Sequence, residues 1–536
     1  MSLRAMLDDR MTDSNRGGFL LPHDYRAGRL LERLGGPEHA QTGDVTPFEL
    51  RFYDSFDWRL HQAGLRLSQV GSRQGRVLRL RNSHGADLLD PVEYPAQPAW
   101  PADLPPGELR KQVAKALEMR VLLPLAVVTG EATELRVLNE DGKTVVRLQL
   151  LQLSCRSQQV SEPRALLPRV RLLPVRGYEA ELRELASFFG REMEWPAAPP
   201  CLFEEALAAV GREPGDYSSK LDLSLRGEQM ALDAMRKIFR HLLDTLERNI
   251  EGTRADLDSE FLHDLRVATR RTRSALTQVK RVLPDAIVEE YKQRFAWLGQ
   301  ITGPTRDLDV FLLELPHYRA SLPDAMAPDL DALESHLRKA QAREQASLKR
   351  KLASAEMRAL LADWHAVLDA ESLPGEPGWF ADLPIERVAS QRIWQMYKKV
   401  RKAGRAVTEE SPPEAMHELR KDCKKLRYLI EFFRSLYPAK ELKGLVKALK
   451  ALLDNLGQFQ DLEVQADKLR EFAADFSPDD PERLPTVMAI GALVADLLRH
   501  QQAAHARFAA CFAAFDAPGN RARYTRLFKH EGKARK

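Results

Sequence analysis

The sequence predicts an α+β protein in which a β-rich N-terminal half precedes an all-helical C-terminal half. In the N-terminal half, apolar and polar residues alternate in 48–54, 64–70 and 76–81, which is typical of strands with one polar face. Beyond residue 220 the apolar residues recur every three to four positions, as in 229–250, which indicates amphipathic helices. Prolines and glycines in 191–220 separate the two patterns and predict a linker.

A hairpin is the clearest local signal of the N-terminal half. Two alternating segments, 133–138 and 143–150, flank an Asp141-Gly142 step that supplies the turn. A helix is expected over 178–190, because Gly190 ends its apolar pattern.

The helical half contains a partial copy of itself. The segment 263–273 returns as 417–427, an offset of 154 residues, and the same offset carries 306–310 onto 460–464. A gapless match of this length indicates an internal duplication, and we expect two bundles of four helices. The predicted boundaries are 1–195 for the β-rich domain, 196–219 for the linker, 220–516 for the helical domain with repeats at about 220–370 and 385–516, and 517–536 for a basic and flexible tail.

Each copy of the motif places a basic stripe beside an apolar stripe on one helix. Six Lys and Arg residues lie between 263 and 281, against Asp264 as the one acid. Stacked like charges repel one another by a few tenths of a kcal/mol per pair, and a bound anion would offset that repulsion. The candidate anion-binding residues are His263, Arg266, Arg270, Arg271, Arg273 and Lys280 in the first copy, and His417, Arg420, Lys421, Lys424, Lys425, Arg427 and Arg434 in the second.

The two motifs resemble those of the CHAD family of helical domains. The resemblance rests on His263-x-x-Arg266-Val267-x-x-Arg270-Arg271-x-Arg273, on Arg306-Asp307-Leu308-Asp309-Val310, and on a weaker second copy, His417-x-x-Arg420-x-x-x-Lys424-Lys425-x-Arg427-Tyr428. It covers about 220–516 and implies two four-helix bundles whose shared basic surface binds inorganic polyphosphate without catalysis. Lys424 and Lys425 stand where the first copy has arginines, which keeps the charge but loses the forked guanidinium geometry.

The N-terminal half is similar to the CYTH domain, a tunnel-shaped β fold of triphosphate-processing enzymes. The resembling residues are 51–67, the 133–150 hairpin and 177–181. The family's Glu-x-Glu-x-Lys signature is absent, since 18–22 reads Gly-Phe-Leu-Leu-Pro, and Arg169-Val170-Arg171-Leu172 replaces the later Glu-x-Glu strand. Metal-assisted phosphoryl chemistry needs carboxylate ligands, so we expect no enzyme activity, no catalytic residue, no metal and no cofactor. Five arginines either line a basic tunnel or lie on solvated strand faces: Arg66, Arg79, Arg81, Arg136 and Arg147.

Several roles stay open from sequence alone. His263 and His417 either donate to phosphate or serve as caps or packing residues. Asp307 and Asp309, repeated as Asp461 and Glu463, either cap a helix and pair with the motif arginines or bind a divalent metal. The tail beyond residue 519 carries seven basic residues and is either solvated or a further contact to a polyanion.

Composition and charge limit the kinds of protein to which this chain could belong. The net charge of +4 arises from 81 basic and 77 acidic residues, so clustering of charge matters more than its sum. Four scattered cysteines without CxxC spacing argue for a reducing compartment and against a zinc site. Neither a signal peptide nor an apolar run of about 18 residues is present, so we expect a cytoplasmic protein with no membrane partner. Association with polyphosphate granules is a further hypothesis.

The basic helices carry few aromatic residues, and Tyr428 is the main exception. Sites for single-stranded nucleic acid usually interleave aromatic stacking platforms with cations. The sequence therefore favours a bare phosphate chain over RNA or DNA. The alternatives are a nucleic-acid-binding protein, and a triphosphatase or polyphosphate hydrolase that uses the N-terminal domain.

Overall fold

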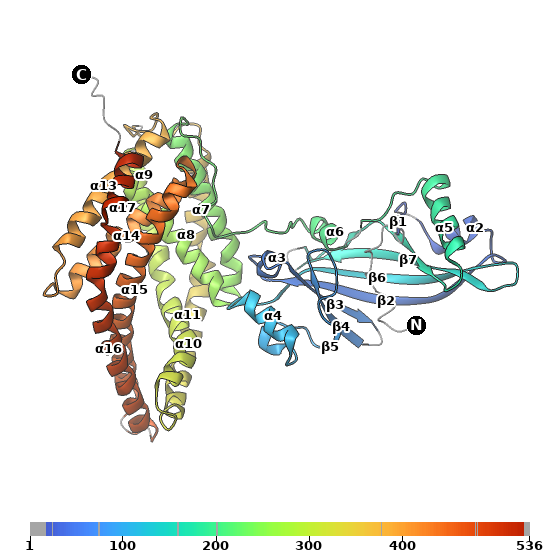
Figure 1. Cartoon of the computed structure of the whole chain (residues 1–536), viewed down its shortest axis with the longest axis horizontal. Helices are drawn as coiled ribbons and strands as arrows, with labels where there is room; N and C mark the ends of the chain where they lie inside the picture. The colour runs from blue at the N-terminus through green and yellow to red at the C-terminus, as the bar shows by residue number, and fades with distance from the viewer. Residues whose placement is uncertain are drawn as a thin grey trace. The chain divides into compact units, whose positions relative to one another are not determined.

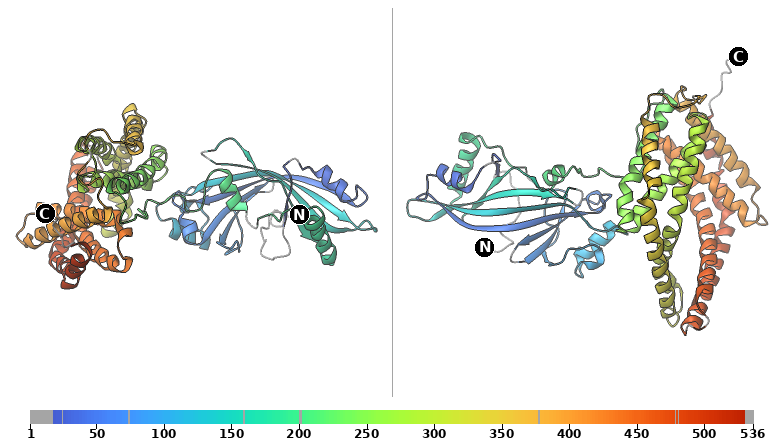
Figure 2. Two further views of the ribbon diagram at one scale, coloured as in Figure 1. Left: turned by 90° about the horizontal axis from the view of Figure 1, so that it is seen from above. Right: turned by 180° about the vertical axis from the view of Figure 1, so that it is seen from behind.

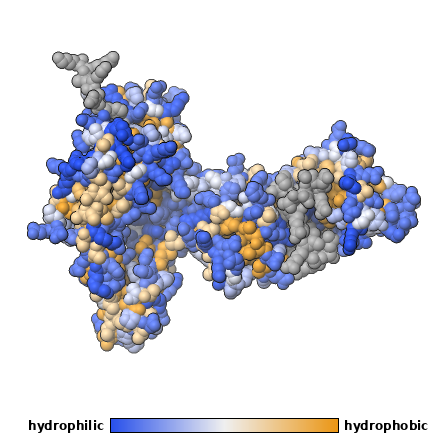
Figure 3. Space-filling view, in the orientation of Figure 1, coloured by the Kyte–Doolittle hydropathy of each residue, from blue (hydrophilic) through white to orange (hydrophobic). Residues whose placement is uncertain are grey.

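The computed structural model confirms the predicted α+β organisation (Figure 1). It describes residues 18–529 apart from 24, 73–74, 158–159, 200–201, 377, 478 and 480. The chain divides into two compact units, Met1–Ser218 and Ser219–Lys536, which we call the β unit and the helical unit. Hydrophilic residues predominate on the face drawn in Figure 3, and hydrophobic residues form smaller patches among them.

The strands of the β unit form one antiparallel sheet (Figure 2). Its order is β1-β9-β7-β6-β2-β3-β4-β5, and β8 pairs with β7. The strand bounds are Phe19–Leu20 (β1), Ala40–Asp54 (β2), Leu65–Ser72 (β3), Gly75–Asn82 (β4), Val92–Glu93 (β5), Leu123–Leu138 (β6), Thr144–Arg156 (β7), Arg164–Ala165 (β8) and Arg169–Pro174 (β9). The helices of this unit are Ala27–Arg33 (α2), Arg59–Gln62 (α3), Glu108–Leu117 (α4), Glu179–Ser187 (α5) and Leu202–Ala209 (α6).

The predicted hairpin is formed by β6 and β7, in a register that pairs Glu134 with Gln149. Gly142 adopts a φ of 72° in the turn, a left-handed conformation that glycine reaches without steric cost. The Asn139 side chain accepts a hydrogen bond from the Lys143 backbone N–H at 2.9 Å, which closes the loop. Local turn chemistry therefore fixes this pairing, as the sequence indicates.

The segment 196–219, expected as a linker, is more ordered than its prolines suggest. Helix α6 lies within it and buries Phe203, Ala206 and Leu207. The Phe203 ring packs edge-on against Phe52 of β2, with 5.2 Å between the ring centroids. Apolar residues between the prolines thus fold back onto the sheet, because their burial outweighs the turn signals around them.

The helices of the helical unit repeat with the same offset as the sequence motif. Their bounds are Ala231–Arg254 (α7), Ser259–Gln278 (α8), Asp285–Ile301 (α9), Gly303–Ser321 (α10), Asp331–Leu352 (α11) and Ala355–Asp369 (α12) in the first repeat, and Ile385–Ala406 (α13), Pro413–Phe432 (α14), Ala439–Asp475 (α15) and Arg483–Phe515 (α16) in the second; Pro518–Phe528 (α17) follows in the tail. Helices α8 and α14 correspond residue for residue, and α15 spans the positions equivalent to α9 and α10 together.

Among the described residues the second repeat forms the four expected helices, α13 to α16, whereas the first forms six, because its counterparts of α15 and α16 are each divided in two. In the first repeat, Pro304 lacks a backbone N–H and stands at the start of α10, so the helix is interrupted at Thr302. The equivalent residue of the second repeat is Gln458, and α15 continues through it. Ser354 caps α12 by accepting a hydrogen bond from the Met357 N–H, whereas its equivalent is Phe508, which lies inside α16.

Both hydrophobic cores of the helical unit draw on both repeats. The larger core joins α7, α8 and α9 to α13, α14 and the first half of α15, and it includes Leu265 and Leu419. The smaller core packs α10 and the first half of α11 against the end of α15 and the start of α16, for example through Leu333 and Leu493. The repeats are thus parts of one structure, and the two motif helices are held against each other.

The predicted flexible tail is helical over its first half. Helix α17 buries Tyr524 and Phe528, and the Tyr524 ring stacks on Tyr397 of α13 at 3.9 Å between centroids. Residues 530–536, with the last basic positions of the tail, lie outside the described residues. Among the helices of the described ranges, none combines the length and the apolarity that a membrane crossing requires.

Candidate functional site

The two motif helices are oriented by their apolar residues. Asp258 caps α8, since its carboxylate accepts hydrogen bonds from the backbone N–H groups of Glu260 and Phe261 at 2.9 and 3.2 Å. Leu262 and Leu265 of α8, with their equivalents Met416 and Leu419 of α14, are buried in the common core. Burial of these positions turns the adjoining basic stripe of each helix away from the core.

Helices α8, α14 and α15 enclose a cleft with a volume of about 520 Å³, which we call the basic cleft. Its cationic lining residues are Lys220, Arg270, Arg271, Arg420, Lys424 and Arg427. Arg270 and Lys424 hold equivalent places in the two repeats and line this one cleft together. The duplication thus produces one shared basic site in the described structure.

Arg270 and Lys424 are the cations of the cleft whose charge is least compensated. Neither forms an ion pair or a hydrogen bond with any residue that the structure describes. Burial, together with the positive charges of Arg420 and Arg270, lowers the pKa of Lys424 to about 8. A lysine in this position gains from an anion, which would stabilise its charged form.

Acidic and polar side chains orient the other cleft arginines. Glu431 bridges the repeats, because its carboxylate pairs with Arg271 of α8 at 3.2 Å and with Arg427 of α14 at 2.7 Å. Arg420 pairs with Asp461 of α15 at 3.0 Å and donates to the Gln460 side chain at 2.6 Å. These contacts hold the guanidinium groups in place while Arg270 and Lys424 remain available to a ligand.

Other predicted site residues lie outside the basic cleft. Lys280 and Lys425 line a separate groove between α8, α9, α13 and α14. Arg266 donates to the Gly299 carbonyl and to Thr302 Oγ1 at 3.2 and 3.0 Å, and burial lowers its pKa. Four predicted site residues remain. Arg273 is exposed and His417 is half-buried. Lys421 pairs with Glu418 at 2.7 Å, and Arg434, which lies beyond the end of α14, pairs with Asp222 at 2.5 Å.

His263 lines the basic cleft, and the Arg306 guanidinium of α10 donates to its Nδ1 at 3.3 Å. Arg306 also donates to the Ser259 carbonyl at 3.1 Å, so it fixes the first turn of α8. The second sequence motif therefore supports the first one structurally. Its equivalent in the second repeat, Gln460, instead contacts Arg420.

The repeated acids take different roles in the two copies. Asp461 pairs with Arg420, as one reading of the sequence expects. Asp309 is buried, accepts a hydrogen bond from Gln341 at 3.2 Å, and has a pKa raised to about 6 by burial. Burial also raises the pKa of Asp307, and the charge of Arg266 opposes that effect. Within the described ranges, no His, Cys, Asp and Glu side chains are grouped as metal ligands.

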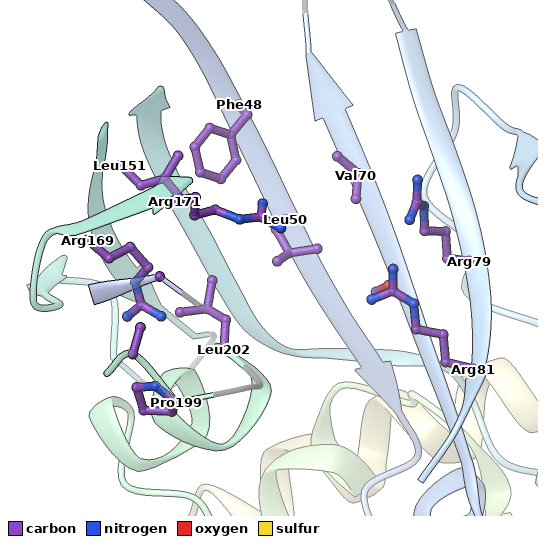
Figure 4. A pocket seen from close by; sticks show the side chains of 13 residues that line it. Phe48, Leu50, Val70, Arg79, Arg81, Leu151, Arg169, Arg171, Pro199 and Leu202 are labelled. Atoms are coloured by element: carbon purple, nitrogen blue, oxygen red, sulfur yellow. The ribbon is translucent and has the colours of Figure 1, made fainter. Parts of the chain in front are cut away.

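A second basic cavity lies in the β unit (Figure 4). Arg79 and Arg81 of β4 and Arg169 and Arg171 of β9 line it, together with apolar side chains such as Leu50. Arg81 pairs with Asp87 at 2.8 Å, and one nitrogen of Arg169 lies 2.7 Å from both carboxylate oxygens of Glu205. The described residues that line this cavity include no carboxylate, so they do not fit a divalent cation.

Four of the five arginines noted in the N-terminal sequence divide between the two predicted placements, and Arg66 takes neither. Arg79 and Arg81 face the cavity, whereas Arg136 and Arg147 are exposed. Arg66 lies over the Phe203 ring of α6, at 4.4 Å from its centroid. Arg169 and Arg171, which stand where the resemblance would place carboxylates, are the other two cavity cations.

Lys220 and Glu431 are among the charged cleft residues that were not predicted from the sequence. Lys220 precedes α7, the first helix of the helical unit, and lies in no periodic segment that would predict a place in the site. Glu431 was overlooked although it stands four residues after Arg427, a spacing at which helical side chains meet. Its contact with Arg271, 160 residues away, has no signal in the sequence.

Comparison with known proteins places the motif helices in a family. The CHAD domain matches residues 237–470. The CHAD domain from the plant Ricinus communis is 25% identical, with 56% of this chain and 96% of that chain covered and a TM-score of 0.47. PptA from Streptomyces chartreusis is 18% identical, with coverage of 53% and 99% and a TM-score of 0.41.

A third solved structure is that of the putative adenylyl cyclase HpAC1 from Hippeastrum, which is described as having a dominant triphosphatase activity. It is 14% identical to this chain. It covers 38% of this chain and 99% of its own chain, at a TM-score of 0.24. No curated protein matches the chain. The match over residues 237–470 includes both motif helices of the basic cleft, and the helical unit of this chain therefore contains a CHAD domain.

Proposed function

We propose that the helical unit binds inorganic polyphosphate in the basic cleft. The observation that carries the proposal is the pairing of Arg270 and Lys424, equivalent residues of two repeats that line one cleft without an ion pair to any described residue. Arginine offers paired donors to phosphate oxygens and lysine offers a point charge, so consecutive phosphate units suit this mixed lining. The CHAD match over residues 237–470 supports the same ligand.

The cleft favours a bare phosphate chain over a nucleic acid. Its aromatic lining residue is Tyr428, whose ring lies 6.5 Å from the ring of Phe432 and parallel to it within 27°. Base stacking would require several such platforms along the path of the strand. Nucleic-acid binding is the second candidate function, and competition with RNA separates the two.

Binding without catalysis is part of the proposal. The cavity of the β unit presents arginines where metal-assisted phosphoryl transfer needs carboxylates, so the described lining residues supply no ligand set for Mg²⁺ or Mn²⁺. The basic cleft contains Asp264, Glu431, Asp454 and Asp461, but Glu431 and Asp461 are engaged by arginines. No residue is assigned a role in bond cleavage.

Titration of the full chain with long-chain polyphosphate tests the proposal. We expect tight binding with a logarithmic salt slope of about −0.7 per phosphate engaged, by analogy with single strands. RNA of matched charge should compete poorly, and equal competition would contradict the assignment. Incubation with tripolyphosphate and Mg²⁺ or Mn²⁺ should release no phosphate, and sustained turnover would establish the enzyme alternative.

A further inference from the structure

The face of α15 that lines the basic cleft continues beyond it as a row of lysines. Lys440, Lys443, Lys447 and Lys450 are all exposed and stand three and four residues apart. The next members of the same spacing are the cleft residues Asp454, Gly457 and Asp461. Residues at this spacing share one helix face, so the four lysines, which we call the lysine row, lead directly into the cleft.

The charge of the lysine row is not neutralised within the described structure. None of its four members forms an ion pair with a described residue. Glu441, the acid of this stretch, is engaged by Arg526 of α17. Arg523 of α17 adds charge at the flank, since a Cβ on Gly444 would lie 2.9 Å from its Nη1. Figure 1 shows α17 in the helical unit, where it packs against α13 and α15.

The lysine row belongs to one repeat only. At the offset of 154 residues, its four positions correspond to Ala286, Glu289, Gln293 and Ala296 of α9. Glu289 pairs with Lys292 at 3.1 Å, so the equivalent face of the first repeat carries no such row. The duplication therefore does not account for the lysine row. The row extends the positive charge of the cleft along α15.

We propose that the lysine row is a track for the part of a linear polyphosphate chain that extends out of the basic cleft. This inference rests on the proposed function of that cleft. Lys440 and Lys450 are ten residues apart, which is about 15 Å along a helix at 1.5 Å per residue. At the roughly 3.4 Å per charge of one DNA strand, the row offers contacts to about four further phosphate units. A polyphosphate chain long enough to extend from the cleft along α15 therefore gains these contacts, and a shorter chain does not.

The test uses the full chain with all four lysines of the row changed to glutamine: Lys440→Gln, Lys443→Gln, Lys447→Gln and Lys450→Gln. Because all four are exposed, the helix should remain folded, which circular dichroism checks. For a polyphosphate of about 100 units, we expect at least about tenfold weaker binding and a salt slope smaller by roughly 2 to 3. Tripolyphosphate, which the cleft alone accommodates, should bind as tightly as it does to the wild type.

A matched control changes four exposed cations of α11 to glutamine: Lys339, Lys349, Arg350 and Lys351. It removes the same charge away from the cleft and should leave the length dependence intact. Unchanged affinity and slope in the row variant, or an equal loss for the short and the long chain, would overturn the track. If the wild type bound no polyphosphate, the function itself would fail. Preferential binding of single-stranded RNA along the row would overturn the assignment to a bare phosphate chain.

Discussion

Charge reversal at Arg270 or Lys424 tests whether the two repeats contact one polyanion. Each variant, Arg270→Glu or Lys424→Glu, removes a cation from the shared cleft and places a carboxylate beside the bound phosphates. A hydrogen bond to a charged group contributes about 1.5–3 kcal/mol, and repulsion by the new carboxylate adds to its loss. We therefore expect each variant to bind long-chain polyphosphate about 100-fold more weakly, which corresponds to about 2.8 kcal/mol.

Titration calorimetry distinguishes a shared cleft from two independent sites. With a shared cleft, either reversal lowers the affinity and leaves the stoichiometry of the residual binding unchanged. With independent sites, one reversal would halve the stoichiometry and leave the remaining affinity at the wild-type value, which would refute the shared site. Lys339→Glu on α11 is the control, because Lys339 is exposed and does not line the cleft. Circular dichroism should show unchanged helix content for all three variants.

Three further predictions follow from the contacts around the cleft and the β-unit cavity. Because the pKa of Lys424 is about 8 in the free protein and a polyanion raises it, binding at pH 8 should take up roughly half a proton, and affinity should fall as the pH rises above 8. Calorimetry in buffers of different ionisation enthalpy measures this uptake, which should vanish in Lys424→Met. Glu431→Gln removes an acid that opposes the ligand, so affinity should rise about threefold, and a weaker complex would show that the carboxylate is needed to position Arg271 and Arg427. Arg169→Met leaves Glu205 without its partner, so the β unit should lose about 2 kcal/mol of stability in thermal unfolding, with polyphosphate affinity unchanged. A parallel loss of affinity would place ligand contacts in that unit.

Much of the fold was predictable because its determinants are local. The apolar spacing of the motif helices and the Asp141-Gly142 turn act over a few residues, and both motif helices and the β6–β7 hairpin formed as predicted. The contrast between Pro304 and Gln458 is also local, since a proline at the start of α10 interrupts the helix and a glutamine at the equivalent place lets α15 continue. The prolines of 196–219 predicted a linker, and burial of Phe203 against the sheet made part of it a helix instead.

The sequence by itself determined the duplication, the basic stripes and the absence of the metal-binding signature. The tertiary structure decided which cations share a site. Arg270 and Lys280 lie on the same basic stripe, yet the packing of α8 against α14, which itself packs against α15, places Arg270 in the basic cleft and Lys280 in another groove. Helical periodicity gives the direction of a side chain from its own axis, whereas its neighbours depend on how helices far apart in the chain pack on a common core. For that reason the bridge from Glu431 to Arg271 and the link between the cleft and the lysine row became visible only in the folded chain.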